Sequence, residues 1–478
     1  MTYKTVQVSL VGASNPNRTK AISSERTLNM YPEAVPSGAY PEVLLPWPGS
    51  KVFSDGLGLG IPRALHTDVA TGNLYKVVDT TLYEISSLGV ETSRGTVTGT
   101  GRVSFSSITD SLGTPGNKLL IATSDNGYVY NITTNSLTRV SDTSYAPGGT
   151  VASINSFAIW QRFDNEYAVG DVGTPESIQG ENISTAISDA DDIVAIYRFR
   201  EIIYMLGTRT TESYYIGSVG TNPLVPIQSG LIPVGLISKS AITNSNTHLY
   251  WIGNDKNLYR TTAYDNQALM PASIARQFEA YNLSDAQLRH IHRDGQDFIL
   301  IITGTKTWVF SETTGAWFEL AYTPDEETYL GFDYAFAYNK HYILSKIDGR
   351  VLELDEDLFT DNLQTTIRER VIAPINGSAL GKNGGRMMMS RAELIMESGI
   401  GSLPSPDPLI MFSASVDGGQ TFSNEDWVRA GREGENRLRV EWYNVNSFRQ
   451  IQIKIRTSDP NFFTFHSLAV DLKMAGRF

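Results

Sequence analysis

No cysteine occurs among the 478 residues of this sequence. A chain without cysteine has no disulfide framework, no thiolate metal site and no cysteine nucleophile. The sequence also lacks any run approaching the ~18 apolar residues of a membrane-spanning helix. Its first residues show no charged segment followed by an apolar one, so we expect synthesis in a cytoplasm without a secretion signal.

Positive charge is scarce as well. The chain has 39 Lys and Arg against 51 Asp and Glu, a net charge of −12. Binding to a nucleic-acid backbone depends on clustered Lys and Arg, so this balance argues against a general nucleic-acid coat. The acidity lies in the first 360 residues, whereas residues 361–478 are nearly balanced.

Histidine, the commonest metal ligand, occurs only six times. Four of the six stand alone in the sequence: His66, His248, His341 and His466. His290 and His292 flank a single residue, so in a strand both would face the same side, where a metal pair is conceivable. Their spacing indicates no third ligand, and we expect a surface or interface role.

What the sequence does contain is a repeated pair of short strands. An apolar run, a turn and a second run recur seven times, and in all but the last the second run carries an aromatic residue. The repeats begin at Gly72, Lys118, Ser156, Glu201, His248, Phe298 and His341. The repeats lie roughly 40 to 50 residues apart, the spacing of propeller blades. The turn pairs Asn126-Gly127 and Asp348-Gly349 suit tight hairpins in which both central residues have positive φ.

A lone hairpin is marginally stable in water, whereas a blade of about four strands buries both faces against its neighbours. The repeats therefore predict an all-β protein with a β-propeller over residues 61–360, of about seven blades, with six as the alternative. Aromatic residues in the repeats should pack between blades. We single out four of them: Tyr83, Tyr130, Tyr259 and Trp308.

Three segments depart from this pattern. Residues 1–60 are rich in proline and aromatics and predict an ordered arm, or a strand that completes the ring. The stretch from Pro271 has helical spacing at Ile274 and Phe278, then a second N-cap candidate at Ser284, so it predicts two short helices inserted between blades. Residues 361–478 contain longer alternating strands and predict a C-terminal β-sandwich.

Three motifs resemble binding or catalytic motifs, but their details favour structural roles. The run DADDI at Asp189 has too few carboxylates for a calcium loop. The glycines from Gly56 to Gly60 lack the flanking strand and helix of a phosphate loop and indicate a turn. The run SVDGGQTF from Ser415 resembles the Asp-box of sialidases, which stabilises a hairpin and is not catalytic. We assign no catalytic, metal-binding or cofactor-binding residue, and we expect the protein not to be an enzyme.

Several segments, in order along the chain, resemble the tail accessory proteins of short-tailed bacteriophages (podoviruses), also called packaged-DNA stabilisation, tail hub or nozzle proteins. The segments that carry the resemblance are Leu28-Asn29-Met30-Tyr31-Pro32 with Pro48-Gly49, Leu74-Tyr75-Lys76-Val77 with Leu82-Tyr83, Ala272-Ser273-Ile274 leading through Tyr281 to Leu288-Arg289 and FILIITGTKTWVF, Tyr329-Leu330-Gly331-Phe332-Asp333, and Ser413-Ala414-Ser415-Val416-Asp417-Gly418. These motifs are short and structural, and none is a catalytic signature.

The resemblance implies a homohexameric ring in the virion tail. Its expected partners are further copies of itself, an adaptor or head-to-tail connector above, a tail needle or plug below, and tailspikes or tail fibres beside it. The ring would retain packaged DNA and act as a conduit for its ejection, without sequence-specific binding, membrane anchor or cofactor. Like charges repel phosphates, so we expect an acidic or uncharged channel.

Two other functions stay open on the residues alone. The Asp-box leaves a sialidase-like glycoside hydrolase as an alternative, although that activity would also require an arginine cluster, a tyrosine nucleophile and acidic partners in the ring. The second alternative is a monomeric propeller that binds carbohydrates or proteins through loops at its mouth. It predicts neither a hexamer nor a virion association.

Overall fold

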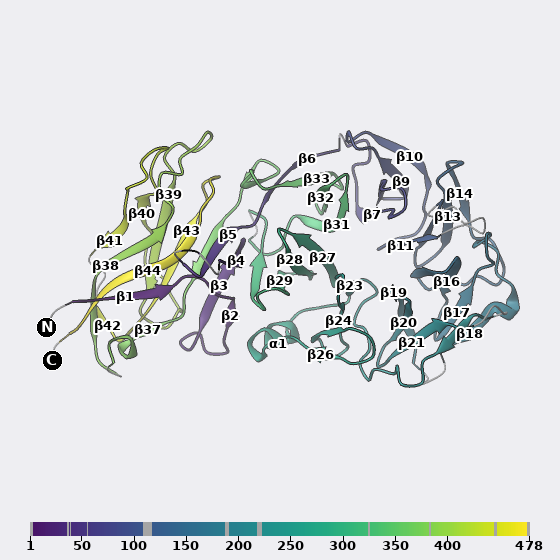
Figure 1. Ribbon diagram of the computed structural model, residues 1–478, viewed down its shortest axis with the longest axis horizontal. Coiled ribbons are helices and arrows are strands. Elements are labelled where there is room, and N and C mark those ends of the chain that lie inside the picture. Colours follow the sequence, from purple (N-terminus) through teal and green to yellow (C-terminus); the bar gives the residue numbers. More distant parts are fainter. Residues whose placement is uncertain are drawn as a thin grey trace.

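The computed structural model describes most of the chain. The described residues are 3–35, 38, 40–54, 56–108, 117–186, 191–217, 222–323, 326–381, 384–443 and 447–475. Nearly all secondary structure in them is β, with one α-helix of eight residues. Figure 1 shows a propeller and a β-sandwich side by side, with both chain termini on the sandwich.

Five blades are separate four-stranded antiparallel sheets. The first blade contains β7 (Pro62–Thr67), β8 (Leu74–Val78), β9 (Thr81–Ile85) and β10 (Glu91–Thr96), and the second contains β11 (Ser104–Ile108), β12 (Lys118–Ala122), β13 (Gly127–Asn131) and β14 (Ser136–Arg139). The third blade contains β15 (Val151–Ile154), β16 (Phe157–Gln161), β17 (Glu166–Val169) and β18 (Ile183–Thr185), and the fourth contains β19 (Ile193–Phe199), β20 (Ile202–Gly207), β21 (Thr211–Ile216) and β22 (Leu224–Pro226). The fifth blade contains β23 (Ile242–Asn244), β24 (Leu249–Ile252), β25 (Leu258–Thr261) and β26 (Gln267–Ala268).

Two further blades belong to larger sheets. Their strands are β27 (Gln287–Arg293), β28 (Gln296–Ile302), β29 (Thr307–Ser311) and β30 (Trp317–Leu320), then β31 (Gly331–Ala337), β32 (Lys340–Ser345) and β33 (Val351–Asp355). The seventh blade takes its fourth strand from the arm, because β6 (Gly49–Val52) pairs antiparallel with β33. The ring thus has seven blades, and the arm closes it. Each predicted repeat forms the second and third strands of one blade, which confirms the propeller.

Apolar clusters between successive blades hold the ring together. Tyr75 of the first blade meets Tyr130 of the second at 5.8 Å between ring centroids. The seventh blade packs on the first through Tyr342, Leu344 and Leu65. Tyr130 and Trp308 are buried as predicted, whereas Tyr83 and Tyr259 are half-buried. Burial of both sheet faces is what makes each small blade stable.

The helical insertion contains one helix, not the two predicted. Helix α1 (Ala272–Glu279) follows Pro271 and buries Ile274 and Phe278 against the neighbouring blades. The expected second helix at Ser284 is wrong, because β27 begins at Gln287 and leaves only a turn. Asn282 accepts a hydrogen bond from the Ser284 backbone N–H in that turn.

Neither predicted turn pair has two positive φ angles. Only Gly349 of the four residues has one. The turn after β12 spans residues 123–126 instead, where the Thr123 hydroxyl oxygen accepts a hydrogen bond from the Asn126 N–H at 2.9 Å. The threonine side chain stabilises that turn and shifts it toward the N-terminus of the expected pair.

The C-terminal residues form the predicted β-sandwich, together with strands of the arm. One sheet contains β4 (Met30–Ala34), β5 (Glu42–Pro46), β44 (Phe465–Met474), β38 (Met387–Met396) and β41 (Val440–Tyr443), with β1 (Lys4–Ser9) on β44 and β42 (Ser447–Phe448) on β38. The other contains β3 (Ser24–Leu28), β36 (Arg368–Val371), β43 (Gln450–Thr457), β39 (Leu409–Ser415) and β40 (Asp426–Arg429), with β2 (Asn15–Pro16) on β3 and β37 (Ile375–Asn376) on β43. Their facing side chains make one apolar core.

Short elements complete the structure. Strands β34 (Thr360–Asp361) and β35 (Gln364–Thr365) extend the sheet of the seventh blade through β6. Two 3-10 turns cover Gly180–Asn182 and Gly377–Leu380. Among the described residues, the only α-helix is far too short to cross a membrane.

Candidate functional site

The propeller and the sandwich are joined by one continuous sheet. Strand β3 of the arm pairs with β30 of the sixth blade on one side and with β36 of the sandwich on the other. The sheet therefore runs from the propeller into the sandwich without a break. We call the contacts around β3 the seam. Because backbone hydrogen bonds cross it, the seam should hold the two domains as one unit.

Arg370 is a deeply buried charged group of the seam, with 2% of its side chain exposed. Its guanidinium donates hydrogen bonds to the Leu10 carbonyl at 2.8 Å and the Ala13 carbonyl at 3.1 Å, and pairs with Glu25 at 3.0 Å. Burial lowers the pKa of Arg370, although Glu25 opposes that shift. The group ties strand β36 of the sandwich to three points of the arm.

Two neighbours of Arg370 extend these contacts to the propeller. Arg26 on β3 pairs with Glu319 of the sixth blade at 3.1 Å and with Glu369 of the sandwich at 3.3 Å. Burial alone would lower the pKa of Arg26, but the two carboxylates together raise it. Asn29, at φ 53°, exchanges hydrogen bonds with the backbone of Ala321. Both side chains therefore bridge the two domains.

Charged side chains meet between β27 and β31, the first strands of the sixth and seventh blades. Arg289 on β27 pairs with Asp333 on β31, and Arg102 lies 3.9 Å from the same carboxylate. The Arg102 guanidinium covers the ring of Phe332 at 3.6 Å. Burial acts to raise the pKa of Asp333, but the two arginines outweigh it and lower that pKa. Burial lowers the pKa of Arg102 to about 9.

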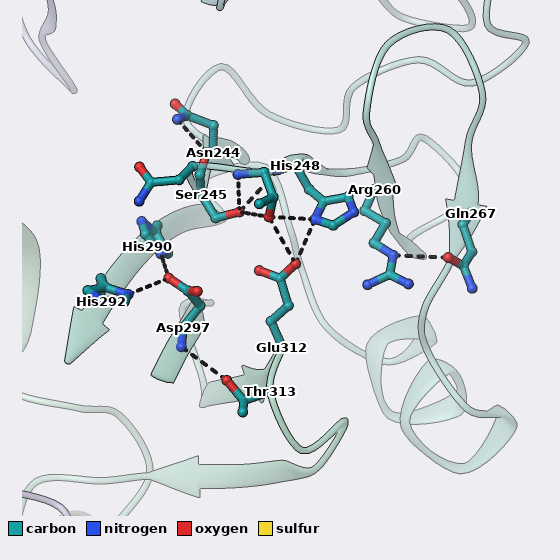
Figure 2. A network of polar contacts seen from close by, with 12 residues as sticks. Asn244, Ser245, His248, Arg260, Gln267, His290, His292, Asp297, Glu312 and Thr313 are labelled. Carbon is teal, nitrogen blue, oxygen red and sulfur yellow. Dashed lines mark hydrogen bonds and ion pairs between the residues drawn. The ribbon is translucent and has the colours of Figure 1, made fainter. Parts of the chain in front are cut away.

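The six histidines do not form a metal centre in the described part of the chain. His290 and His292 both bond to one oxygen of Asp297, at 2.7 Å and 2.9 Å (Figure 2). These hydrogen bonds outweigh the effect of burial and lower the pKa of Asp297. Across the same region, His248 pairs with Glu312 at 2.6 Å. No group of three or more potential ligands suited to a metal occurs within the described ranges.

The Asp-box performs a structural task in the hairpin between β39 and β40. Asp417 accepts hydrogen bonds from the Ser415 hydroxyl at 2.7 Å and from the backbone N–H groups of Gln420 and Thr421 at 2.9 Å and 3.0 Å. Hydrogen bonds from Thr421 are the main cause of a strongly lowered pKa for Asp417. Gly418 and Gly419 supply positive φ angles of 78° and 81°.

The two remaining motifs are also built into the fold. Part of DADDI, Asp189 with Ala190, lies outside the described residues. Asp191 accepts backbone hydrogen bonds from Thr208, Arg209 and Thr210 and so closes the hairpin between β20 and β21. The glycine run forms a loop over a fully buried ion pair, Lys76–Glu91, at 2.6 Å.

Sequence reasoning missed the seam arginines and the ion pair between Arg289 and Asp333. Arg368, Glu369 and Arg370 alternate in a short strand whose residues are all buried. The sequence signal that could have revealed them is a run of charged residues within one strand, flanked by apolar residues. Glu369 and Arg370 have partners more than 300 residues away in the sequence, in the arm, so the pattern could not say what these two residues contact. Arg368 instead donates to the carbonyls of Phe359 and Asp459.

Comparison with protein families gives two matches, in the order of the two domains. The model described as bacteriophage P22 Gp10, beta-propeller, matches residues 7–359. The model described as bacteriophage P22 Gp10, beta-sandwich, matches residues 376–473. Together they cover both domains. No curated protein sequence matches the chain.

Several solved structures are similar to part of this chain at low sequence identity. The WD40 β-propeller domain of Doa1 is 13% identical over 65% of this chain and 97% of its own, with a TM-score of 0.42. The N-terminal domain of Nup159 is 9% identical over 64% and 94%, with a TM-score of 0.40. The extracellular domain of BT4673 from B. thetaiotaomicron is 10% identical over 76% and 45%, with a TM-score of 0.44. These likenesses add nothing to the family match.

Proposed function

This chain belongs to the bacteriophage P22 Gp10 family, and from that premise we propose that it forms a ring in the tail of a short-tailed phage that retains packaged DNA and conducts it at ejection. The observation that carries the proposal is the match of both domains, in order, to a phage stabilisation family. As a virion protein it would be made in the cytoplasm of the host bacterium.

The contacts between domains support a mechanical task. Packaged DNA presses outward on whatever closes the tail, so a part of the closure should resist hinging between its domains. The seam supplies that stiffness, because strand pairing and buried ion pairs cross it. An interface between domains without such contacts would allow relative motion.

The proposed conduit lies between copies of the chain and not through one propeller. The contacts of Arg102 with Phe332 and of Arg289 with Asp333 hold blades together, which supports a path for DNA outside the propeller. Identical copies related by rotation enclose a channel when their interfaces close into a ring. We propose six copies, with an acidic or uncharged channel wall along which phosphates slide.

The partners follow from a position between head and tail tip. We propose contacts with an adaptor or connector ring above, a tail needle or plug below, and tailspikes or fibres beside the ring. The protein would act without catalysis, since its Asp-box stabilises a hairpin. Hydrolysis of a chromogenic sialoside, lost on mutation of carboxylates in the ring, would instead favour the glycosidase alternative.

The mass of the assembly tests the proposal. Light scattering of the purified protein, alone and mixed with its phage's connector protein, should reveal a species of six copies of the 52.7 kDa chain, about 316 kDa, in addition to the connector. A protein that stays monomeric in both samples contradicts the ring. A channel lined with Lys and Arg in such an assembly would contradict the proposed sliding wall.

A further inference from the structure

A cavity of about 680 Å³ lies among the loops at the ends of four propeller blades. The loops that lead into the first, second, sixth and seventh blades line it. The turns between the second and third strands of the first, sixth and seventh blades line it as well. Its apolar walls are Ile61, Pro62, Ile302, Tyr329 and Phe332. A volume of this size is typical of sites for small ligands or short peptide segments.

Three polar side chains that line this cavity each have one buried atom without a hydrogen-bond partner among the described residues. The atoms are Nη2 of Arg63, Nη1 of Arg102 and Oε1 of Gln287. Arg63 and Gln287 are 3% and 4% exposed. A buried polar atom that lacks a partner destabilises a fold by about 1–3 kcal/mol. Three side chains with such atoms line this one cavity.

Arg63 is held in place before any ligand binds. Its Nε donates to the Gly101 carbonyl at 2.7 Å, and its Nη1 donates to the Asp79 and Val97 carbonyls, both at 2.9 Å. These bonds fix the plane of the guanidinium and leave Nη2 as the remaining donor. A preorganised donor loses little conformational entropy on binding.

Arg102 is held by different contacts. It stacks on Phe332 and donates to the Phe332 carbonyl at 3.4 Å, while its Nη1 lies 3.9 Å from Asp333, beyond hydrogen-bond distance. Two guanidinium donors therefore need an acceptor, and a carboxylate is the acceptor whose geometry suits them. The Gln287 oxygen needs an N–H or O–H donor from the same ligand.

We propose that this cavity binds a polypeptide segment of another protein that presents an acidic side chain between apolar ones. The carboxylate bonds to Arg63 and Arg102, a backbone N–H of the segment donates to Gln287, and the apolar side chains lie against Ile302 and Tyr329. The proposal rests on the chain's own geometry and does not depend on the proposed tail function.

A sugar acid offers the same carboxylate and fits the cavity less well. Sugars need many polar partners and an open aromatic face, but Arg102 covers Phe332. Asp79 already accepts a hydrogen bond from the Ile61 N–H at 2.9 Å. The mainly apolar walls favour leucine-like side chains over hydroxyl groups.

Immobilised peptides test the proposal on the full-length protein. Each peptide has Glu at its centre and every pairing of Leu, Ile, Phe and Tyr on either side, and a twin array has Gln at the centre. The best Glu peptides should retain roughly tenfold more protein than their Gln twins, the effect of losing a charged hydrogen bond. Equal retention on both arrays overturns the proposal.

Matched variants locate the binding. Arg102→Gln should abolish the preference for Glu, Gln287→Leu should weaken retention severalfold without changing net charge, and exposed Arg139→Gln should change nothing. Circular dichroism melting confirms that each variant is folded. If neither Arg102→Gln nor Gln287→Leu changes the retention of the protein on Glu peptides, the proposal is overturned. It is also overturned if the protein binds N-acetylneuraminic acid and shows no preference between Glu and Gln peptides.

Discussion

The ring and the seam are stabilised by different interactions. Each blade of the ring comes mostly from one contiguous stretch of chain, and its neighbours meet it through apolar side chains. The seam joins segments about 300 residues apart in the sequence, and buried charged groups fill it. Apolar contacts tolerate small shifts of one blade against another, whereas a buried guanidinium requires its acceptors in fixed places.

This difference assigns a separate task to each region. The ring provides a stable scaffold, and the seam sets the position of the sandwich relative to it. If that is correct, variants in the ring lower the stability of the whole protein, and variants in the seam also separate the unfolding of the two domains. The predictions below test this contrast.

The largest loss of stability is expected in the ring. Trp160 is fully buried between the second and third blades, and its indole N–H donates to the Pro175 carbonyl at 2.9 Å. Trp160→Ala should lower the free energy of unfolding by about 4 kcal/mol, because it leaves a large cavity. Urea unfolding followed by circular dichroism measures it. The control is Trp427→Ala, which removes an exposed tryptophan and should change that free energy by less than about 0.5 kcal/mol.

Arg370→Met comes next. It leaves the Leu10 and Ala13 carbonyls and Glu25 without their donor, so the free energy of unfolding should fall by about 3 kcal/mol. In calorimetry the parent protein should unfold in one transition. Arg370→Met should unfold in two, because the two domains lose their coupling. A single transition, unchanged from that of Arg139→Met, would contradict the importance of the seam.

Asp361, on strand β34 in the sheet of the seventh blade, gives the stability of the protein a pH dependence. Burial raises the pKa of this carboxyl to about 6, and the Ser50 hydroxyl and Arg368 oppose that shift. Between pH 4 and 6 the folded protein binds a proton that the unfolded chain releases, so stability falls as pH rises through that window, by about 2 kcal/mol.

The test is a comparison of unfolding free energies from pH 4 to 7. Asp361→Asn should remove this fall, and exposed Asp357→Asn should keep it. If the parent and Asp361→Asn have parallel pH profiles, Asp361 does not titrate as its burial implies.

The smallest effect is expected for Arg26→Met. The Arg26 side chain is 24% exposed, and water screens its ion pairs with Glu319 and Glu369. Its loss should lower the free energy of unfolding by about 1 kcal/mol. If Arg26→Met lowers the free energy of unfolding as much as Arg370→Met does, the degree of burial does not determine how much each seam contact contributes to stability.

The sequence was sufficient to predict the ring, because each repeat carries its own signal. The strand pairs that begin at Gly72 and Lys118 are local, and alternation shows them directly. The seam could not be predicted, since Arg370 and Leu10 meet only after both domains fold. The cavity was missed for the same reason: its residues come from four blades, and none of them forms a sequence motif.

Electron cryomicroscopy of the intact phage tail tests the central claim most directly. Our account predicts six copies around the tail axis, each with its propeller and sandwich in the arrangement of Figure 1 and with DNA passing between the copies. A tail that lacks this protein, or one in which a single copy surrounds the DNA with its own propeller, would contradict it.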